Sequence, residues 1–181
     1  LSRATRALQR RNADLELLVA ERTAEISEQT RRLVTSKQEV IAAQAATITA
    51  FCALAEARDN ETGNHIRRTQ HYVRILAEKL QDHPRFRGEL NEEIIQLLFK
   101  SAPLHDVGKV ATPDAILLKQ GKLTPEEWVI MKLHCEYGRN AIVQAENALG
   151  GAVDASFLRY AAEIAYGHHE RWDGNGYPSG L

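Results

Sequence analysis

The sequence predicts an all-α protein, and two features of the chain carry that prediction. Between Leu1 and Phe51 there is no Gly or Pro, and the composition is rich in residues that favour helices. Further along, apolar residues recur at helical spacing rather than in the strict alternation of a half-buried strand. The clearest example is the stripe formed by Tyr72, Ile75, Leu76 and Leu80.

The N-terminal segment, residues 1–50, is expected to form one long helix with a coiled-coil seam. A seven-residue ladder is mostly apolar as far as Val40, and its companion positions are apolar at Leu8 and Leu15 but polar at Arg22. We expect a parallel homodimer that transmits register changes from an upstream sensor or receiver domain. A solvated helix packed on its own domain, or a spacer, remains the alternative. The ladder consists of Asn12, Val19, Ile26, Leu33, Val40 and Thr47.

Residues 51–181 are expected to form a separate helical domain. Helical pattern continues through Ala57, breaks over 59–63 and resumes over 65–80. A helix over 91–104 is bent near its end by Pro103, and a connector follows over 110–123. Thr124-Pro125-Glu126-Glu127 combines an N-cap, a first-turn proline and a capping-box glutamate. We expect that helix to reach Tyr137 and stop at Gly138, with another over 155–166 and a Gly-rich loop over 170–181.

Charge and composition exclude several classes of function. The formal net charge is -1, which gives no long-range attraction to nucleic acid. Early arginines such as Arg10 are followed by acidic residues, and no base-reading motif is present. No apolar run approaches the ~20 residues of a membrane span, and no signal peptide is visible. Cys52 and Cys135 are too few for a disulfide framework, so we expect a cytoplasmic protein.

The strongest chemical signal is His105-Asp106-Val107-Gly108-Lys109. Neighbouring side chains on a helix diverge by ~100°, but Pro103 and Gly108 indicate that the helix ends here. Asp106 can then bridge two metals while His105 binds one of them, and Lys109 can meet a phosphate as a point charge. The alternative is a helix-end histidine that caps carbonyls, followed by a capping aspartate.

Other histidines and a glutamate extend this signal. Glu61 and His65 are four residues apart and would share a helix face suited to one ion, although a surface pair is the alternative. His168 and His169 follow the last predicted helix and would serve two metals, or a metal and a substrate. His134 could be a half-buried helix residue or a ligand. The whole set exceeds one tetrahedral zinc site and suits iron, manganese or zinc in a multinuclear centre.

These residues, in this order, resemble the HD-GYP family, a branch of the HD-type metal-dependent phosphohydrolases. The resemblance runs from about Phe51 to Leu181, and its most specific part is the last of its motifs. The motifs are Arg58-Asp59-Asn60-Glu61-Thr62-Gly63-Asn64-His65 with Arg68, Leu104 to Lys109, Lys132-Leu133-His134, and His168-His169-Glu170-Arg171-Trp172-Asp173-Gly174-Asn175-Gly176-Tyr177-Pro178.

The resemblance implies a helical bundle around two or three divalent metals, with iron or manganese expected. His105, Asp106, His134, His168 and His169 match the family's metal ligands. Glu61 and His65 match the additional ligands of members that hold three metals. Lys109 matches the lysine that contacts the substrate phosphate, so Asp106 and Lys109 are the expected catalytic residues. Gly176, Tyr177 and Pro178 match the loop that lines the substrate groove and meets partner proteins.

The activity that the resemblance implies is hydrolysis of cyclic di-GMP to pGpG or GMP in a signalling protein, with GGDEF-domain proteins as possible partners. Two alternatives stay open: a phosphohydrolase acting on another nucleotide, and a silent regulatory module. Family members continue past this loop to a helix with a further metal-binding Asp and to basic residues that hold substrate. We expect the full protein to continue beyond Leu181 and to supply them.

Overall fold

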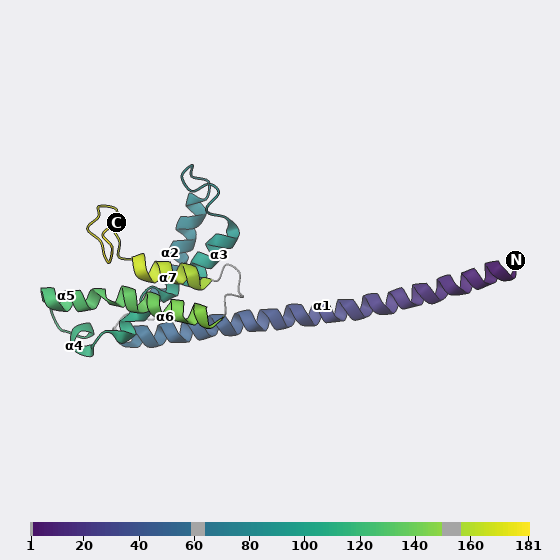
Figure 1. Ribbon diagram of the computed structural model, residues 1–181, viewed down its shortest axis with the longest axis horizontal. Coiled ribbons are helices and arrows are strands. Elements are labelled where there is room, and N and C mark those ends of the chain that lie inside the picture. The colour runs from purple at the N-terminus through teal and green to yellow at the C-terminus, as the bar shows by residue number, and fades with distance from the viewer. Residues whose placement is uncertain (1, 59–63, 150–156) are drawn as a thin grey trace. The chain divides into compact units, whose positions relative to one another are not determined.

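The computed structural model describes residues 2–58, 64–149 and 157–181, and it divides into two units, Leu1–Ala45 and Ala46–Leu181. Every named element in the described ranges is helical (Figure 1). An isolated bridge between Arg87 and Leu90 is the sole strand-like pairing among them. The predicted all-α class is therefore confirmed. The predicted domain boundary at residue 50 stays a prediction.

The first unit is the N-terminal part of α1, which spans Arg3–Arg58. Large apolar side chains along the predicted seam face solvent here: Leu15 is 51% exposed, Val19 62% and Leu33 71%. The helix surface also carries ion pairs one turn apart, such as Arg31 to Glu28 at 2.8 Å, which stabilise an isolated helix by a few tenths of a kcal/mol. The predicted unbroken helix is confirmed, and its apolar seam is unpartnered within the described chain.

One 18-residue window of α1 is long and apolar enough to cross a membrane by composition alone, with a mean hydropathy of 1.6. Only 11% of that window is buried. A single helix of this kind is weak evidence for a membrane span, because helices of other origin meet the same criterion.

The second unit contains the C-terminal end of α1 and a set of shorter helices. In chain order these are α2 (His65–Leu80), α3 (Glu92–Ser101), the 3₁₀ helices η1 (Ala102–Leu104) and η2 (Val107–Ala111), α4 (Asp114–Leu117), α5 (Pro125–Lys132), α6 (His134–Ala148) and α7 (Phe157–Gly167). Helices α6 and α7 pack against each other, and so do α2 and α3.

Local chemistry explains where these helices begin. The Asn91 side chain accepts a hydrogen bond from the Ile94 N–H at the start of α3. Thr124 and Glu127 form the predicted reciprocal capping box at the start of α5. The sequence prediction was wrong at the next boundary, because α5 ends at Lys132 and α6 runs straight through Gly138. A one-residue bend at Leu133 makes His134 the first residue of α6.

Gly138 lies inside α6 because a neighbouring backbone comes close there. A Cβ on Gly138 would lie 3.3 Å from the Gly108 backbone nitrogen. The glycine therefore marks a packing contact and not a helix end. The connector predicted over 110–123 also contains the short helix α4, which the sequence analysis did not anticipate.

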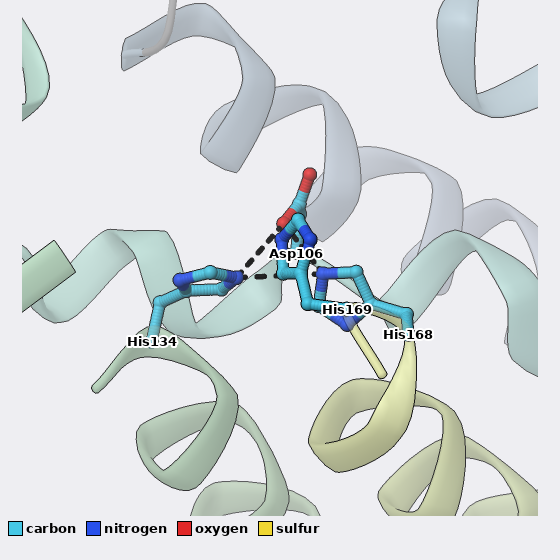
Figure 2. Close-up of side chains that lie close together, drawn as sticks. All are labelled: Asp106, His134, His168 and His169. Atoms are coloured by element: carbon cyan, nitrogen blue, oxygen red, sulfur yellow. Dashed lines mark hydrogen bonds and ion pairs between the residues drawn. The ribbon is translucent and has the colours of Figure 1, made fainter. Parts of the chain in front are cut away.

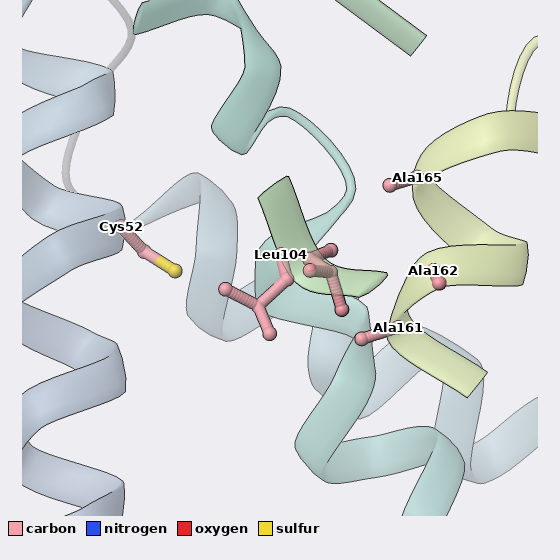
Figure 3. Close-up of a cluster of buried hydrophobic side chains, with 6 residues drawn as sticks. Cys52, Leu104, Ala161, Ala162 and Ala165 are labelled. Carbon is pink, nitrogen blue, oxygen red and sulfur yellow. The ribbon is translucent and has the colours of Figure 1, made fainter. Parts of the chain in front are cut away.

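A buried apolar cluster of the second unit is rich in small side chains (Figure 3). Cys52 comes from α1, Leu104 from η1 and Ile142 from α6, while α7 contributes Ala161, Ala162 and Ala165. A row of alanines lets α7 approach its neighbours closely. The buried Ser101 hydroxyl lies 2.7 Å from the Phe157 carbonyl oxygen and ties α3 to the start of α7.

The backbones of η2 and α6 come close to each other at Gly108. A Cβ at Gly108 would lie 1.9 Å from the His134 carbonyl oxygen and 2.5 Å from the Gly138 nitrogen. Both contacts are with backbone atoms, which cannot rotate away. Only glycine therefore allows η2 to rest on the first turn of α6.

Gly108→Ala is expected to destabilise the protein by about 1–3 kcal/mol or more, because η2 must move away from α6. Thermal and denaturant unfolding of the purified protein would measure this. Gly167→Ala is the matched control, since the nearest atom to its new Cβ is the Glu170 Cγ at 4.0 Å. Equal stability of the two variants would contradict the close-approach argument.

Candidate metal centre

A compact group of ligand-type side chains lies where η1, η2, α6 and the end of α7 meet (Figure 2). Asp106, His134, His168 and His169 each offer one ligand atom, and these atoms all lie within 4.8 Å of one another. Asp106 joins the two 3₁₀ helices, His134 begins α6, and His168 and His169 follow α7. Three separate segments of the chain therefore converge on one point.

Backbone carbonyls orient the imidazole rings of this group. The His134 Nδ1 lies 2.6 Å from the Met131 carbonyl oxygen, and the His168 Nδ1 lies 3.1 Å from that of Ala165. A carbonyl oxygen only accepts, so each Nδ1 carries the proton. In a neutral ring the Nε2 then bears the lone pair. This arrangement is typical of histidines that bind a metal through Nε2.

The lone pairs of the group point at one another. The Nε2 atoms of His134 and His168 are 3.4 Å apart, and each lies 3.4 Å from the Asp106 Oδ1. That Oδ1 is buried and accepts no hydrogen bond from the described residues. Two imidazole nitrogens and a carboxylate oxygen, all acceptors, thus face a common space. Only a cation or added protons can relieve this repulsion.

Protonation of the histidines is not the favoured solution. Burial lowers the pKa of His134, and the hydrogen bond to Met131 only partly opposes this effect. Burial and the neighbouring His168 lower the pKa of His169 to about 4. Both rings are therefore neutral near pH 7. Neutral imidazoles are the form that binds metal without first losing a proton.

Asp106 is the anion of the site. Burial alone would raise its pKa, but interactions with His105, His168 and Lys109 outweigh burial and hold its pKa far below the usual range. The Lys109 Nζ lies 3.0 Å from the Asp106 Oδ2. Asp106 is thus ionised, with Oδ2 toward Lys109 and Oδ1 toward the imidazoles.

His105 lies on the Oδ2 side of the carboxylate. Its Nε2 is 3.2 Å from the Asp106 Oδ2, and its Nδ1 is 2.9 Å from the Ala102 carbonyl oxygen. Burial lowers the pKa of His105, but the Asp106 interactions outweigh it and leave that pKa raised. His105 therefore differs electrostatically from His134, and it lies outside the four-residue group.

The loop after α7 covers one side of the group. The Tyr177 ring stacks on His169 at a centroid distance of 4.5 Å and an interplanar angle of 23°. The Tyr177 N–H donates to the His169 carbonyl oxygen at 3.2 Å. Gly176 permits this return, because a Cβ there would lie 2.4 Å from the Arg171 nitrogen and 2.6 Å from the His169 carbonyl oxygen. Pro178 follows through a cis peptide bond.

Glu170 closes the same loop, a role that the sequence analysis did not assign. Its carboxylate accepts hydrogen bonds from the N–H groups of Ser179 at 2.6 Å, Gly180 at 3.0 Å and Leu181 at 3.0 Å. Its position directly after two histidines and before a Gly-rich run was the available signal. Side-chain acceptors often stabilise such turns.

Of the two additional metal ligands predicted from the sequence, Glu61 and His65, the structure describes one. Glu61 lies outside the described residues. His65 begins α2, and its ring centroid is 5.7 Å from that of His105. A small pocket between them is lined by Cys52, Glu56, His65, His105, Asp106 and Lys109. Glu56, another residue missed from sequence, accepts a hydrogen bond from the Ile66 N–H at 3.2 Å and so supports the first turn of α2.

The residues present fit a divalent metal. The Asp106 Oδ1 is a buried acceptor with no hydrogen-bond donor among the residues that the structure describes, and the imidazole nitrogens beside it are oriented with their lone pairs inward. Mixed imidazole and carboxylate ligands suit iron, manganese or zinc. Asp106, His134, His168 and His169 would hold the ion, with His105 on the other side of the carboxylate.

Comparison with known proteins agrees with this geometry. The HD domain family matches residues 18–181. A Vibrio cholerae protein named "Probable cyclic di-GMP phosphodiesterase" is 53% identical over 76% of this chain and 31% of its own length. Another from the same species, named cyclic di-GMP phosphodiesterase, is 52% identical over 82% of this chain and 30% of its own length.

A third Vibrio cholerae relative, named 3'3'-cGAMP-specific phosphodiesterase 2, is 42% identical over 70% of this chain and 21% of its own length. The chain thus spans about a third or less of the length of these relatives. It is a helical domain with a histidine–aspartate centre, and it belongs to the HD domain family, in the HD-GYP branch.

Asp106→Asn is expected to remove about one metal ion per chain, because the amide lacks the charge that offsets the cation. Elemental analysis of the purified full-length protein would measure the loss. His83→Ala is the control, because His83 lies in the loop between α2 and α3. Wild-type metal content in Asp106→Asn would contradict the assignment of the site.

Proposed function

We propose that the protein containing this chain is a metal-dependent phosphodiesterase that hydrolyses cyclic di-GMP to pGpG or GMP. The observation that carries the proposal is the convergence of the Asp106 carboxylate and the imidazoles of His134 and His168 on one space. The printed names of the two relatives above 50% identity support the substrate.

The chain's own residues suit this chemistry. A bound divalent ion would supply Lewis acidity and lower the pKa of a water molecule. Asp106 and the neutral histidines would hold that ion. The Lys109 ammonium lies 3.0 Å from the Asp106 Oδ2, so it is available beside the centre to neutralise charge on a substrate phosphate. Tyr177, stacked on His169, places an aromatic ring beside the centre and would contact a nucleotide bound there.

We further propose that two or three ions are bound and that iron or manganese is the native metal. The arrangement of His105 on the Oδ2 side of Asp106 and of the other imidazoles on the Oδ1 side supports at least two positions. His65, close to His105, would serve a further ion together with Glu61. GGDEF-domain proteins are proposed partners for the loop at Gly176, Tyr177 and Pro178.

Hydrolysis of cyclic di-GMP by the full-length protein, loaded with manganese or iron, tests the proposal. The double variant His105→Ala with Asp106→Ala is expected to lose more activity than the roughly 10–100-fold typical of removing an outer partner of a metal ligand. His83→Ala should retain wild-type turnover. Undiminished turnover in the double variant would exclude this centre as the active site, and preference for 3'3'-cGAMP in a substrate panel would overturn the substrate assignment.

We also propose that α1 forms a parallel homodimer that carries signals from an upstream sensor or receiver domain in the cytoplasm. The support is the exposure of apolar side chains at heptad positions, with Leu15 at 51% and Val19 at 62%. Such a row of exposed apolar side chains would be covered by a second copy of the helix. Both cysteines are free and buried, as suits a reducing compartment.

Leu15→Glu or Val19→Glu is expected to shift the full-length protein from dimer toward monomer in sedimentation analysis, because a charge would enter the seam. Leu17→Glu is the matched control, since Leu17 is 64% exposed but lies off the seam. A wild-type monomer, or equal dimerisation of all variants, would rule out this interface.

A further inference from the structure

The last residue of α1, Arg58, binds the segment that directly follows the metal-centre motif. Its guanidinium donates to the Val110 carbonyl oxygen through Nη1 and to the Thr112 carbonyl oxygen through Nη2 at 3.2 Å. The same Nη2 donates to the Asp114 carboxylate at 2.5 Å. One side chain thus contacts the end of η2 and the start of α4.

The buried acceptor among these is the Thr112 carbonyl, whereas Val110 is 52% exposed and the Asp114 side chain 68% exposed. The last carbonyls of a helix have no partner within it, and Val110 and Thr112 lie at the C-terminal end of η2. Thr112 is 1% exposed, so water cannot serve it freely. The planar guanidinium can serve several acceptors at once, and a lysine ammonium does not reproduce that geometry.

Any movement of the segment that Arg58 binds would also displace residues of the metal centre. Residues 107–111 form η2, which carries Lys109 and begins directly after Asp106. Gly108 rests on the His134 carbonyl with no room for a Cβ. A shift of η2 would therefore change the position of Lys109 and the distance from Asp106 to His134.

The same end of α1 also binds the backbone on the other side of the motif. The Cys52 thiol donates to the Pro103 carbonyl oxygen at 3.3 Å, two residues before His105. Together, Cys52 and Arg58 attach α1 to the chain before and after the His105–Lys109 segment. The C-terminal turns of α1 are thus the support on which that segment rests.

We propose that Arg58 is a positioning residue for the metal centre, which holds η2, and with it Asp106 and Lys109, in register with α6. Its loss frees the end of η2 without removing any metal ligand. The expected loss of kcat rests on the proposed phosphodiesterase function. The expected loosening of the η2 backbone does not depend on that function.

The test compares Arg58→Ala and Arg58→Lys with Arg159→Ala in the full-length protein. Arg159 is the matched control, because among the described residues its one ion pair is with Glu163, and both side chains are exposed on α7. In Arg58→Ala, amide hydrogen exchange across residues 107–112 should quicken at least about tenfold, and kcat should fall about 10–100-fold with little change in KM. Added millimolar guanidinium should restore part of kcat. Arg58→Lys should resemble Arg58→Ala.

Metal content measured in parallel should fall less in both Arg58 variants than in Asp106→Asn, because no residue of the four-residue group is removed. Unchanged exchange over 107–112 in Arg58→Ala would overturn the inference, and so would full activity in Arg58→Lys. If Arg58→Ala does not fold, Asp114→Asn replaces it, with a smaller rise in exchange expected and an unchanged rate counting against the proposal. A wild-type protein without phosphodiesterase activity would refute the proposed function, while hydrogen exchange would still decide the role of Arg58.

Discussion

The mutual approach of acceptor atoms at Asp106 is the constraint on which the rest of this domain depends. Two imidazole nitrogens and a carboxylate oxygen lie 3.4 Å from one another. Such a grouping is unfavourable until a cation enters it. The surrounding fold must therefore hold the three side chains together against their repulsion. It does so with backbone carbonyls on the histidine Nδ1 atoms, with the alanine-rich face of α7, and with the contact of Gly108 on α6.

Much of the fold could be predicted from local signals. The unbroken α1, the capping box at Thr124 and the end of the helix near Pro103 each follow from short-range chemistry. The boundary at Leu133 could not be predicted, because both flanking segments favour helix and no Gly or Pro lies between Pro125 and Gly138. Gly138 was misread for a different reason. Its helix-breaking tendency is real, but the close approach of η2 makes a small residue necessary at that position.

The candidate site, like the fold, could be predicted from the sequence only in part. The types and order of the residues indicated a histidine–aspartate centre, because so many potential metal ligands occur within a short stretch of sequence. The sequence did not show that the histidines lie in two different electrostatic environments. Burial lowers the pKa of His134, whereas at His105 the interactions with Asp106 outweigh burial and leave the pKa raised. The contacts of Arg58 and Glu170 were equally hidden, since most of their partners are backbone groups that no side-chain motif records.

The 3₁₀ geometry of η2 has a consequence for how homologous chains can vary in length. From Pro103 to Thr112 both ends of the segment are attached to α1, and its middle rests on α6 without space for a methyl group. An inserted or deleted residue in this stretch would turn Asp106 away from the imidazoles, whatever residue was added. Length changes should therefore accumulate in the turn between α2 and α3 and between α4 and α5, where no side chain of the four-residue group is attached.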